Sequence, residues 1–135
     1  MLRTALLTLA CATALAGCEV LTAPHGAEIE TRAVYTLPPE AALQATFTVV
    51  NHGPGAVDVP TCGDRIAVGV ERAEGDAWAE ASGSVCPANL SSVPLTLQDG
   101  ERVQGAVPFG AGGTFRVRLH LLNGPQVVSR SFTVR

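Results

Sequence analysis

Short runs of alternating apolar and polar residues fill the chain from residue 28 to residue 135, and Gly, Pro, Asn and Asp separate them. The clearest runs are Leu43 to Val50 and Thr114 to Leu122, in which every second residue is apolar. A period of two indicates a β-strand with one buried face, and no run in this region sustains the 3.6-residue period of a helix. The sequence therefore predicts an all-β domain.

The spacing of the turn signals predicts how these strands are arranged. Turn residues recur about every 8–12 residues, which predicts seven or eight short strands and is typical of a sandwich or a barrel. The odd-looking number of predicted strands and the open ends of the strand arrangement favour an immunoglobulin-like antiparallel β-sandwich. Its first strand is expected to run from Ile29 to Leu37 and to end at Pro38-Pro39.

Asn123-Gly124 is the strongest short-range hairpin signal in the chain. Pairing about this turn places Phe115 opposite Phe132, which would be a core contact. The same pairing places Arg130 opposite Val117, and the sequence offers no explanation for that pair.

Gly75-Asp76 predicts a second two-residue hairpin, in which the numbers of paired residues sum to 151. This register sets Ile66 against Val85. It also sets Glu71 opposite Glu80 on the outer face, where two like charges would repel each other.

The first eighteen residues have the layout of an export signal. Met1-Leu-Arg3 is a positive start, Thr4 to Leu15 is apolar, and small residues precede Cys18. A membrane-spanning helix is an alternative, but the apolar run is shorter than the roughly 20 residues that a span requires. An ordinary secretory signal is the other alternative, although it would not need a cysteine at the cleavage point.

Leu15-Ala16-Gly17-Cys18 closely resembles the lipobox of bacterial lipoproteins. The resemblance implies that the Cys18 thiol receives a diacylglyceryl group and that cleavage leaves Cys18 as the first residue. It divides the chain into a signal peptide (1–17), a lipidated tether (18–27) and a β-sandwich domain (28–135). It also implies a lipid anchor in a membrane of the bacterial cell envelope, with the domain on the extracytoplasmic side.

The cysteines outside the N-terminal region are Cys62 and Cys86, and an even pair in an exported domain predicts a disulfide. Zinc is the alternative, but a zinc site needs two further ligands, and no histidine lies at metal-ligand spacing from either cysteine. We therefore expect no metal site.

Charge and composition argue against nucleic acid as a partner. All nine basic residues are arginine, and removal of Arg3 with the signal leaves eight against twelve acidic residues, a net charge of −4. Nucleic-acid binding depends on a basic field, so none is expected here.

No arrangement of residues predicts catalysis or a cofactor. The histidines and carboxylates are scattered over loops, turns and an exposed strand face, with no pair placed for acid–base chemistry. Gly110 to Gly113 lacks the lysine and the strand-to-helix setting of a phosphate-binding loop. We therefore expect a binding or structural domain rather than an enzyme.

Two surface features have alternative interpretations. Arg116, Arg118 and His120 lie on one side of a strand and form a cationic row. The row would contact acidic lipids or an acidic partner, or it is a solvated face offset by nearby glutamates. Trp78 is either an interaction anchor or a side chain that packs across small residues.

The direction of the first strand predicts which end of the sandwich meets a partner. The tether would leave the loop at Asn51 to Gly55 near the membrane. The opposite end would then present Leu37, Pro38, Pro39 and Phe109 to another envelope or extracellular protein.

Three short segments resemble bacterial immunoglobulin-like domains, including the intracellular proteinase inhibitor (BsuPI-type) family: Phe47 to Asn51 with Gly53, Leu97 to Glu101, and Gly113 to Arg116. The resemblance implies a β-sandwich and, as an alternative to partner binding, protease inhibition. An inhibitor would need a long, rigid, exposed loop, for which Cys86 to Pro94 is the candidate. The cysteine pair and the lipobox depart from an intracellular inhibitor.

Overall fold

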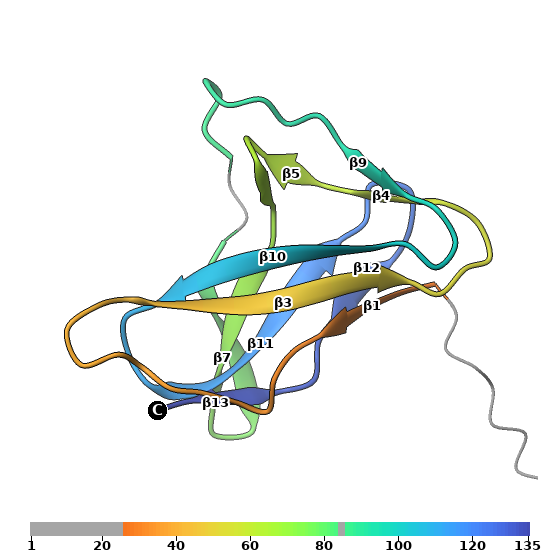
Figure 1. The fold of residues 1–135 in the computed structure, drawn as a ribbon. Helices are drawn as coiled ribbons and strands as arrows, with labels where there is room; N and C mark the ends of the chain where they lie inside the picture. Colours follow the sequence, from red (N-terminus) through yellow and green to blue (C-terminus); the bar gives the residue numbers. More distant parts are fainter. Residues whose placement is uncertain (1–25, 84–85) are drawn as a thin grey trace, which may run out of the picture.

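The computed structural model describes residues 26–83 and 86–135, and this part of the chain forms strands, turns and loops without a helix. Two sheets face each other, and the strands of one cross those of the other at an angle (Figure 1). The three-stranded sheet has the order β1 (Ala27–Glu30), β3 (Leu43–Asn51), β10 (Arg102–Phe109).

The six-stranded sheet has a central strand, β11, with partners on both sides. Its order is β2 (Val34–Tyr35), β13 (Phe132–Val134), β11 (Gly113–His120), β7 (Gly69–Glu74), β8 (Ala77–Ser82), and β12 (Gln126–Val128) also pairs with β11. Two small ladders lie outside these sheets: β4 (Val57–Val59) with β9 (Leu95–Leu97), and β5 (Thr61–Cys62) with β6 (Arg65–Ile66).

This connectivity is immunoglobulin-like. The chain alternates between the sheets so that β1, β3 and β10 occupy the A, B and E positions, and β7, β11 and β13 occupy C, F and G. The prediction of an all-β, immunoglobulin-like sandwich is confirmed. The described residues form thirteen strands instead of seven or eight, because short ladders and breaks divide the longer runs.

The first strand is one of these breaks. Instead of one strand from Ile29 to Leu37, β1 pairs antiparallel with β3, and β2 pairs parallel with β13 in the other sheet. The chain therefore changes sheets between Glu30 and Val34. The Tyr35 hydroxyl donates to the Thr46 carbonyl at 2.5 Å and ties the crossing segment back to β3.

The core lies between the sheets and includes a cluster of aromatic rings. Phe109 packs against Phe115 and Phe132, with ring centroids 4.7 and 5.8 Å away, and Tyr35 meets Phe132 at 5.2 Å. The expectation that Phe109 is exposed at one end is wrong, because it is 6% exposed within this cluster. The last residue of β10 faces inward, where the chain crosses from one sheet to the other.

The Asn123-Gly124 hairpin is partly as predicted. Phe115 pairs with Phe132 as expected, but nearer the turn the register is shifted by one residue, with Leu119 opposite Val127. The extra residue is accommodated around Ser129, whose backbone N–H and hydroxyl bond the backbone of Val117. The predicted pairing of Arg130 with Val117 is therefore wrong, because Ser129 takes that place.

The Gly75-Asp76 hairpin keeps its predicted register close to the turn, where Glu71 pairs with Glu80. An irregularity between Val70 and Glu71 then ends the register. Ile66 pairs with Thr61 in the separate β5–β6 hairpin, so its predicted pairing with Val85 is wrong; Val85 itself lies outside the described residues.

Position 105 requires a glycine for a reason that the alternation of apolar and polar residues does not predict. It lies in β10 opposite Phe47, and a Cβ atom at Gly105 would overlap the Phe47 ring. The Phe47 ring occupies the space that a side chain at Gly105 would fill. The missing side chain at Gly105 therefore leaves room for the buried Phe47 ring beside β10.

We predict that Gly105→Ala lowers the free energy of unfolding by about 1–3 kcal/mol, because the methyl group forces the Phe47 ring from its site. Gly110→Ala is the matched control, since a Cβ atom there meets nothing within 4 Å. Urea denaturation of the two variants measures the difference. Equal stabilities would show that the ring moves without cost.

Candidate binding surface around the disulfide

The two arginines of the cationic row are paired with carboxylates on the same face, and His120 is exposed at the end of the row. Glu71, only 8% exposed, binds Arg116 through one oxygen at 2.5 Å and Arg118 through the other at 3.1 Å. Arg118 also reaches Glu80 at 3.3 Å, so one guanidinium bridges the two carboxylates that the hairpin sets opposite each other. The solvated, glutamate-offset interpretation of this row is the one the structure supports.

Trp78 lies on this outer face and is opposite Ala73. The Arg116 guanidinium lies over its indole ring, 4.3 Å from the centroid, which is close enough for a cation–π interaction. The small side chain of Ala73 leaves room for the ring. Trp78 thus packs along the sheet, as the second interpretation expected.

Cys62 and Cys86 form a disulfide with their Cα atoms 5.4 Å apart, which confirms the predicted pair. The bond joins the β5–β6 hairpin to the segment that leads toward β9. Neither element belongs to a large sheet, so the disulfide fixes the position of chain that sheet pairing leaves free.

The segment from Cys86 to Leu95 is an exposed loop held along its length, and we call it the disulfide loop. The Gly63 N–H donates to the Ser91 carbonyl at 2.6 Å, and the Thr61 hydroxyl donates to the Val93 carbonyl at 2.5 Å. Its far end enters β9, which pairs with β4. Hydrogen bonds to the β5–β6 hairpin therefore hold the loop between its two fixed ends.

Large apolar side chains are unusually exposed on this loop. Leu90 is 46% exposed, Val93 is 72% exposed and Leu95 is 37% exposed. Single exposed apolar residues are common on protein surfaces, but three within six residues on a fixed loop are typical of an interaction site. Leu90 and Val93 lie in the segment from Cys86 to Pro94, which the sequence offers as a candidate inhibitor loop, although no single side chain in it was predicted to bind.

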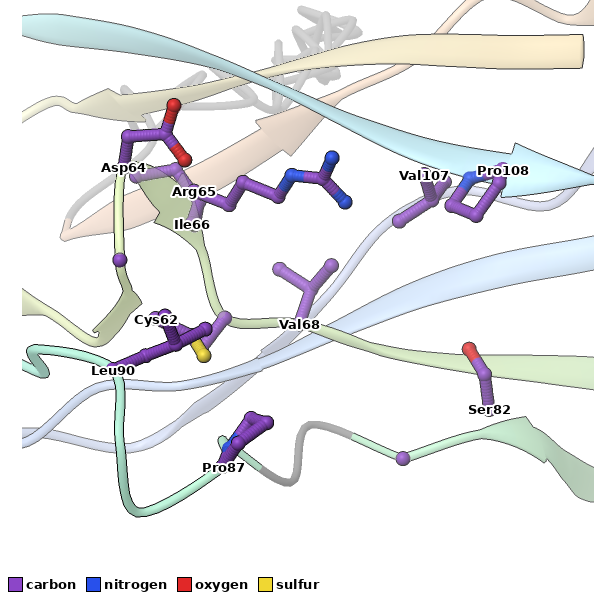
Figure 2. Close-up of a pocket in the computed structure, with 13 residues that line it drawn as sticks. Cys62, Asp64, Arg65, Ile66, Val68, Ser82, Pro87, Leu90, Val107 and Pro108 are labelled. Carbon is purple, nitrogen blue, oxygen red and sulfur yellow. The ribbon is translucent and has the colours of Figure 1, made fainter.

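A cavity of about 570 Å³ lies beside the loop (Figure 2). Figure 2 shows the Arg65 side chain reaching from β6 toward Val107 and Pro108, in a hollow whose lining is mainly apolar but includes Asp64 and Ser82. The apolar side chains that line it come from β6, the segment before β7, the disulfide loop and β10: Ile66, Val68, Pro87, Leu90, Val107 and Pro108.

The other predicted partner-binding residues lie at one end of the sandwich. Leu37 is half-buried against the core, whereas Pro38 and Pro39 are exposed, and all three line a hollow that also includes Gly110. With Phe109 buried, this end presents a smaller apolar surface than expected. Partner binding by Leu37, Pro38 and Pro39 stays a prediction.

Cys18 and the rest of the lipobox lie outside the described residues. Within residues 26–83 and 86–135, no three His, Cys, Asp or Glu side chains come together as a possible metal site. The same residues contain no helix long and apolar enough to span a membrane.

Comparisons with known proteins give little further information. No protein-family model matches the chain, and no curated protein matches it by sequence, so the resemblance to the intracellular proteinase inhibitor family gains no support. Among solved structures, the chain is similar to the ASH / PapD-like domain of human CEP192 (PapD-like domain 7). The two are 13% identical with a TM-score of 0.39, over 98% of this chain and 94% of that chain. These values carry no inference about function.

We predict that replacing both cysteines, Cys62→Ala with Cys86→Ala, lowers the free energy of unfolding by about 3.5 kcal/mol, because the unfolded chain regains the entropy of a loop of about 25 residues. Urea denaturation measures the loss. Intact-mass analysis with and without reductant checks the bond itself, and two free thiols in the exported protein would contradict it.

Proposed function

We propose that this protein is a lipid-anchored domain of the bacterial cell envelope, which faces the extracytoplasmic side and binds another envelope or extracellular protein. Two observations support the location. The N-terminal segment resembles a lipobox ending at Cys18, and the folded domain contains a disulfide, which persists in oxidising compartments. Acyl chains on Cys18 would each add about 0.8 kcal/mol of membrane affinity per buried methylene.

The exposed apolar side chains of the disulfide loop are the observation that carries the binding function. The disulfide and the hydrogen bonds to Thr61 and Gly63 fix the loop before any partner arrives. Binding by a preorganised loop avoids much of the entropy cost of ordering, so a small apolar surface is enough for useful affinity. Leu90 and Val93 are the side chains that we expect a partner to cover.

Protease inhibition is a second candidate, and the same loop favours it. A protease inhibitor must offer an exposed segment that stays rigid in the protease cleft. The segment from Cys86 to Pro94 is exposed and is fixed at both ends, as the sequence analysis required of such a loop.

We expect Cys18→Ser to abolish incorporation of labelled fatty acid and to release the domain from membranes in cell fractionation, because the serine hydroxyl cannot replace the acylated thiol. Cys11→Ser, in the apolar part of the signal, is the matched control and should label normally. Wild-type labelling of the Cys18 variant would refute the anchor.

Leu90→Ser combined with Val93→Ser should reduce capture of the partner from envelope extracts by about tenfold, because two exposed anchors are lost while the core is untouched. Leu122→Ser removes an exposed leucine elsewhere, 58% exposed, and should leave capture unchanged. Circular dichroism checks that all variants fold. Equal capture by the loop variant and the control would move the interface elsewhere.

The same variants separate the two candidate functions. Stoichiometric loss of peptidase activity on mixing the wild-type domain with a purified serine protease, relieved by the loop substitutions, would favour inhibition. Capture without any effect on peptidase activity favours binding alone.

A further inference from the structure

On one side of the sandwich, neither of the two large sheets continues across the core. β10 is the last strand of the three-stranded sheet, and β8 is the last strand of the six-stranded sheet. β9 immediately precedes β10 in the chain, but it pairs with β4 and does not continue the sheet beyond β10. The edges of β8 and β10 therefore flank a side of the core that no strand of the two large sheets covers, and the short strand β6 lies near β10 there.

Two cavities follow this side and meet each other. The cavity of about 570 Å³ beside the disulfide loop and a second of about 250 Å³ are both lined by Ser82 and Pro108, so they are neighbours. We call the pair the lateral groove. Its walls are mainly apolar, from Val68 and Val107 at one end to Val70, Phe109 and Phe115 at the other.

An arginine stands at each end of the lateral groove. Arg65 lines the first cavity and Arg72 lines the second. Neither forms an ion pair within residues 26–83 and 86–135, in contrast to Arg102, Arg116 and Arg118, which bind glutamates. Arg72 reaches only the Gly112 carbonyl, at 3.5 Å, and lies over the Phe115 ring at 5.9 Å.

The carboxylates of the neighbouring strands are directed elsewhere. Arg72 pairs with Phe115 across β7 and β11 and shares its inward face, whereas Glu71 is on the opposite face, bound to Arg116 and Arg118. Asp64 adjoins Arg65 in the hairpin and lines the same cavity, and the Arg65 side chain extends beyond it toward Val107 and Pro108 (Figure 2). Among the described residues Asp64 forms no ion pair with Arg65, so the groove presents an arginine in each cavity between mainly apolar walls.

We propose that the lateral groove binds an extended, acidic segment of a partner polypeptide, with apolar side chains in the two cavities and carboxylates on Arg65 and Arg72. The seven-residue interval between the two arginines spans at most about 23 Å of extended chain, so a segment of similar length bridges them. This proposal deepens the protein-binding function above and rests on it, since the two share Leu90 at one end of the groove.

Pro108 is consistent with β10 serving as an edge. Proline has no N–H to donate to a neighbouring strand, and it is found in sheets almost entirely at edges. Pro108 lies opposite Gln44 of β3, one pair before the end of β10. A bound segment would thus be held near Pro108 by apolar contact and charge rather than by a continuous backbone ladder.

The test uses the folded domain and an amidated peptide of about seven residues, Glu-Val-Ser-Leu-Ser-Val-Glu, whose apolar residues share one side when extended. Fluorescence anisotropy measures its affinity, with Lys-Val-Ser-Leu-Ser-Val-Lys as the charge-reversed peptide. Arg65→Gln with Arg72→Gln should weaken binding of the acidic peptide by about tenfold, because two charge-assisted contacts are lost. Arg130→Gln, an exposed arginine outside the groove, is the matched control.

Amide hydrogen exchange locates the peptide, and protection is expected in β8, β10 and the residues of the groove. Equal affinity for the two peptides, equal effects of the groove and control variants, or protection confined to other strands would each overturn the proposal. Sedimentation of the domain alone tests the other occupant, a second copy of the chain; a dimer that the groove variants dissociate would also overturn it. If the wild-type domain captures the partner but does not bind the acidic peptide, the groove is refuted and the disulfide loop remains as the binding surface.

Discussion

The buried amide of Asn51 determines where the segment before β10 can go. Asn51 is fully buried; its side chain donates to the Gly55 and Leu97 carbonyls at 2.8 and 3.0 Å and accepts from the Gly53 N–H. A buried amide left without these partners would cost about 1–3 kcal/mol for each lost bond. Because the bond to Leu97 fixes the end of β9 beside the end of β3, β9 pairs with β4, and β10 remains the last strand of the three-stranded sheet.

Charge pairing then decides which arginines remain available to a ligand. A β-strand directs successive side chains to opposite faces, so Glu71 and Arg72 are separated by the sheet although they are neighbours in sequence. Glu71 joins Arg116 and Arg118 in a network that neutralises the outer face. Arg72 faces the gap between the sheets, where no carboxylate meets it among the described residues. The arginines of the row that looks most cationic in the sequence, Arg116 and Arg118, are therefore paired with glutamate. The arginines that remain available to a ligand are Arg65 and Arg72, which form no ion pair among the described residues.

The sequence is most informative where periodicity and burial coincide. Alternation in Leu43 to Val50 and around Phe115 predicts both the strands and their inward faces, since a one-residue slip would expose the core. It fails where one extra residue enters a strand, as at Ser129, because a bulge has no residue signature of its own. It also fails from Cys86 to Leu95, where the disulfide and hydrogen bonds, rather than a buried face, fix the chain. The candidate site lies mainly in that segment, so its cysteine pair and an exposed loop from Cys86 to Pro94 were predictable, whereas the hydrogen bonds that hold the loop and the cavity beside it were not.

The direction of the chain relates these surfaces to the proposed anchor. Gly26 and the loop after β3 bond each other through the Gly26 N–H and the Gly53 carbonyl, so the domain begins at the end of the sandwich that this loop occupies. Gly110 lies at the other end, where it lines both the Arg72 part of the lateral groove and the hollow at Leu37. If Cys18 holds the domain to a membrane, the groove extends from the disulfide toward the outward end. A partner that arrives from outside would then meet Arg72 before the disulfide loop, and an acidic residue at the leading end of its segment would make the first contact.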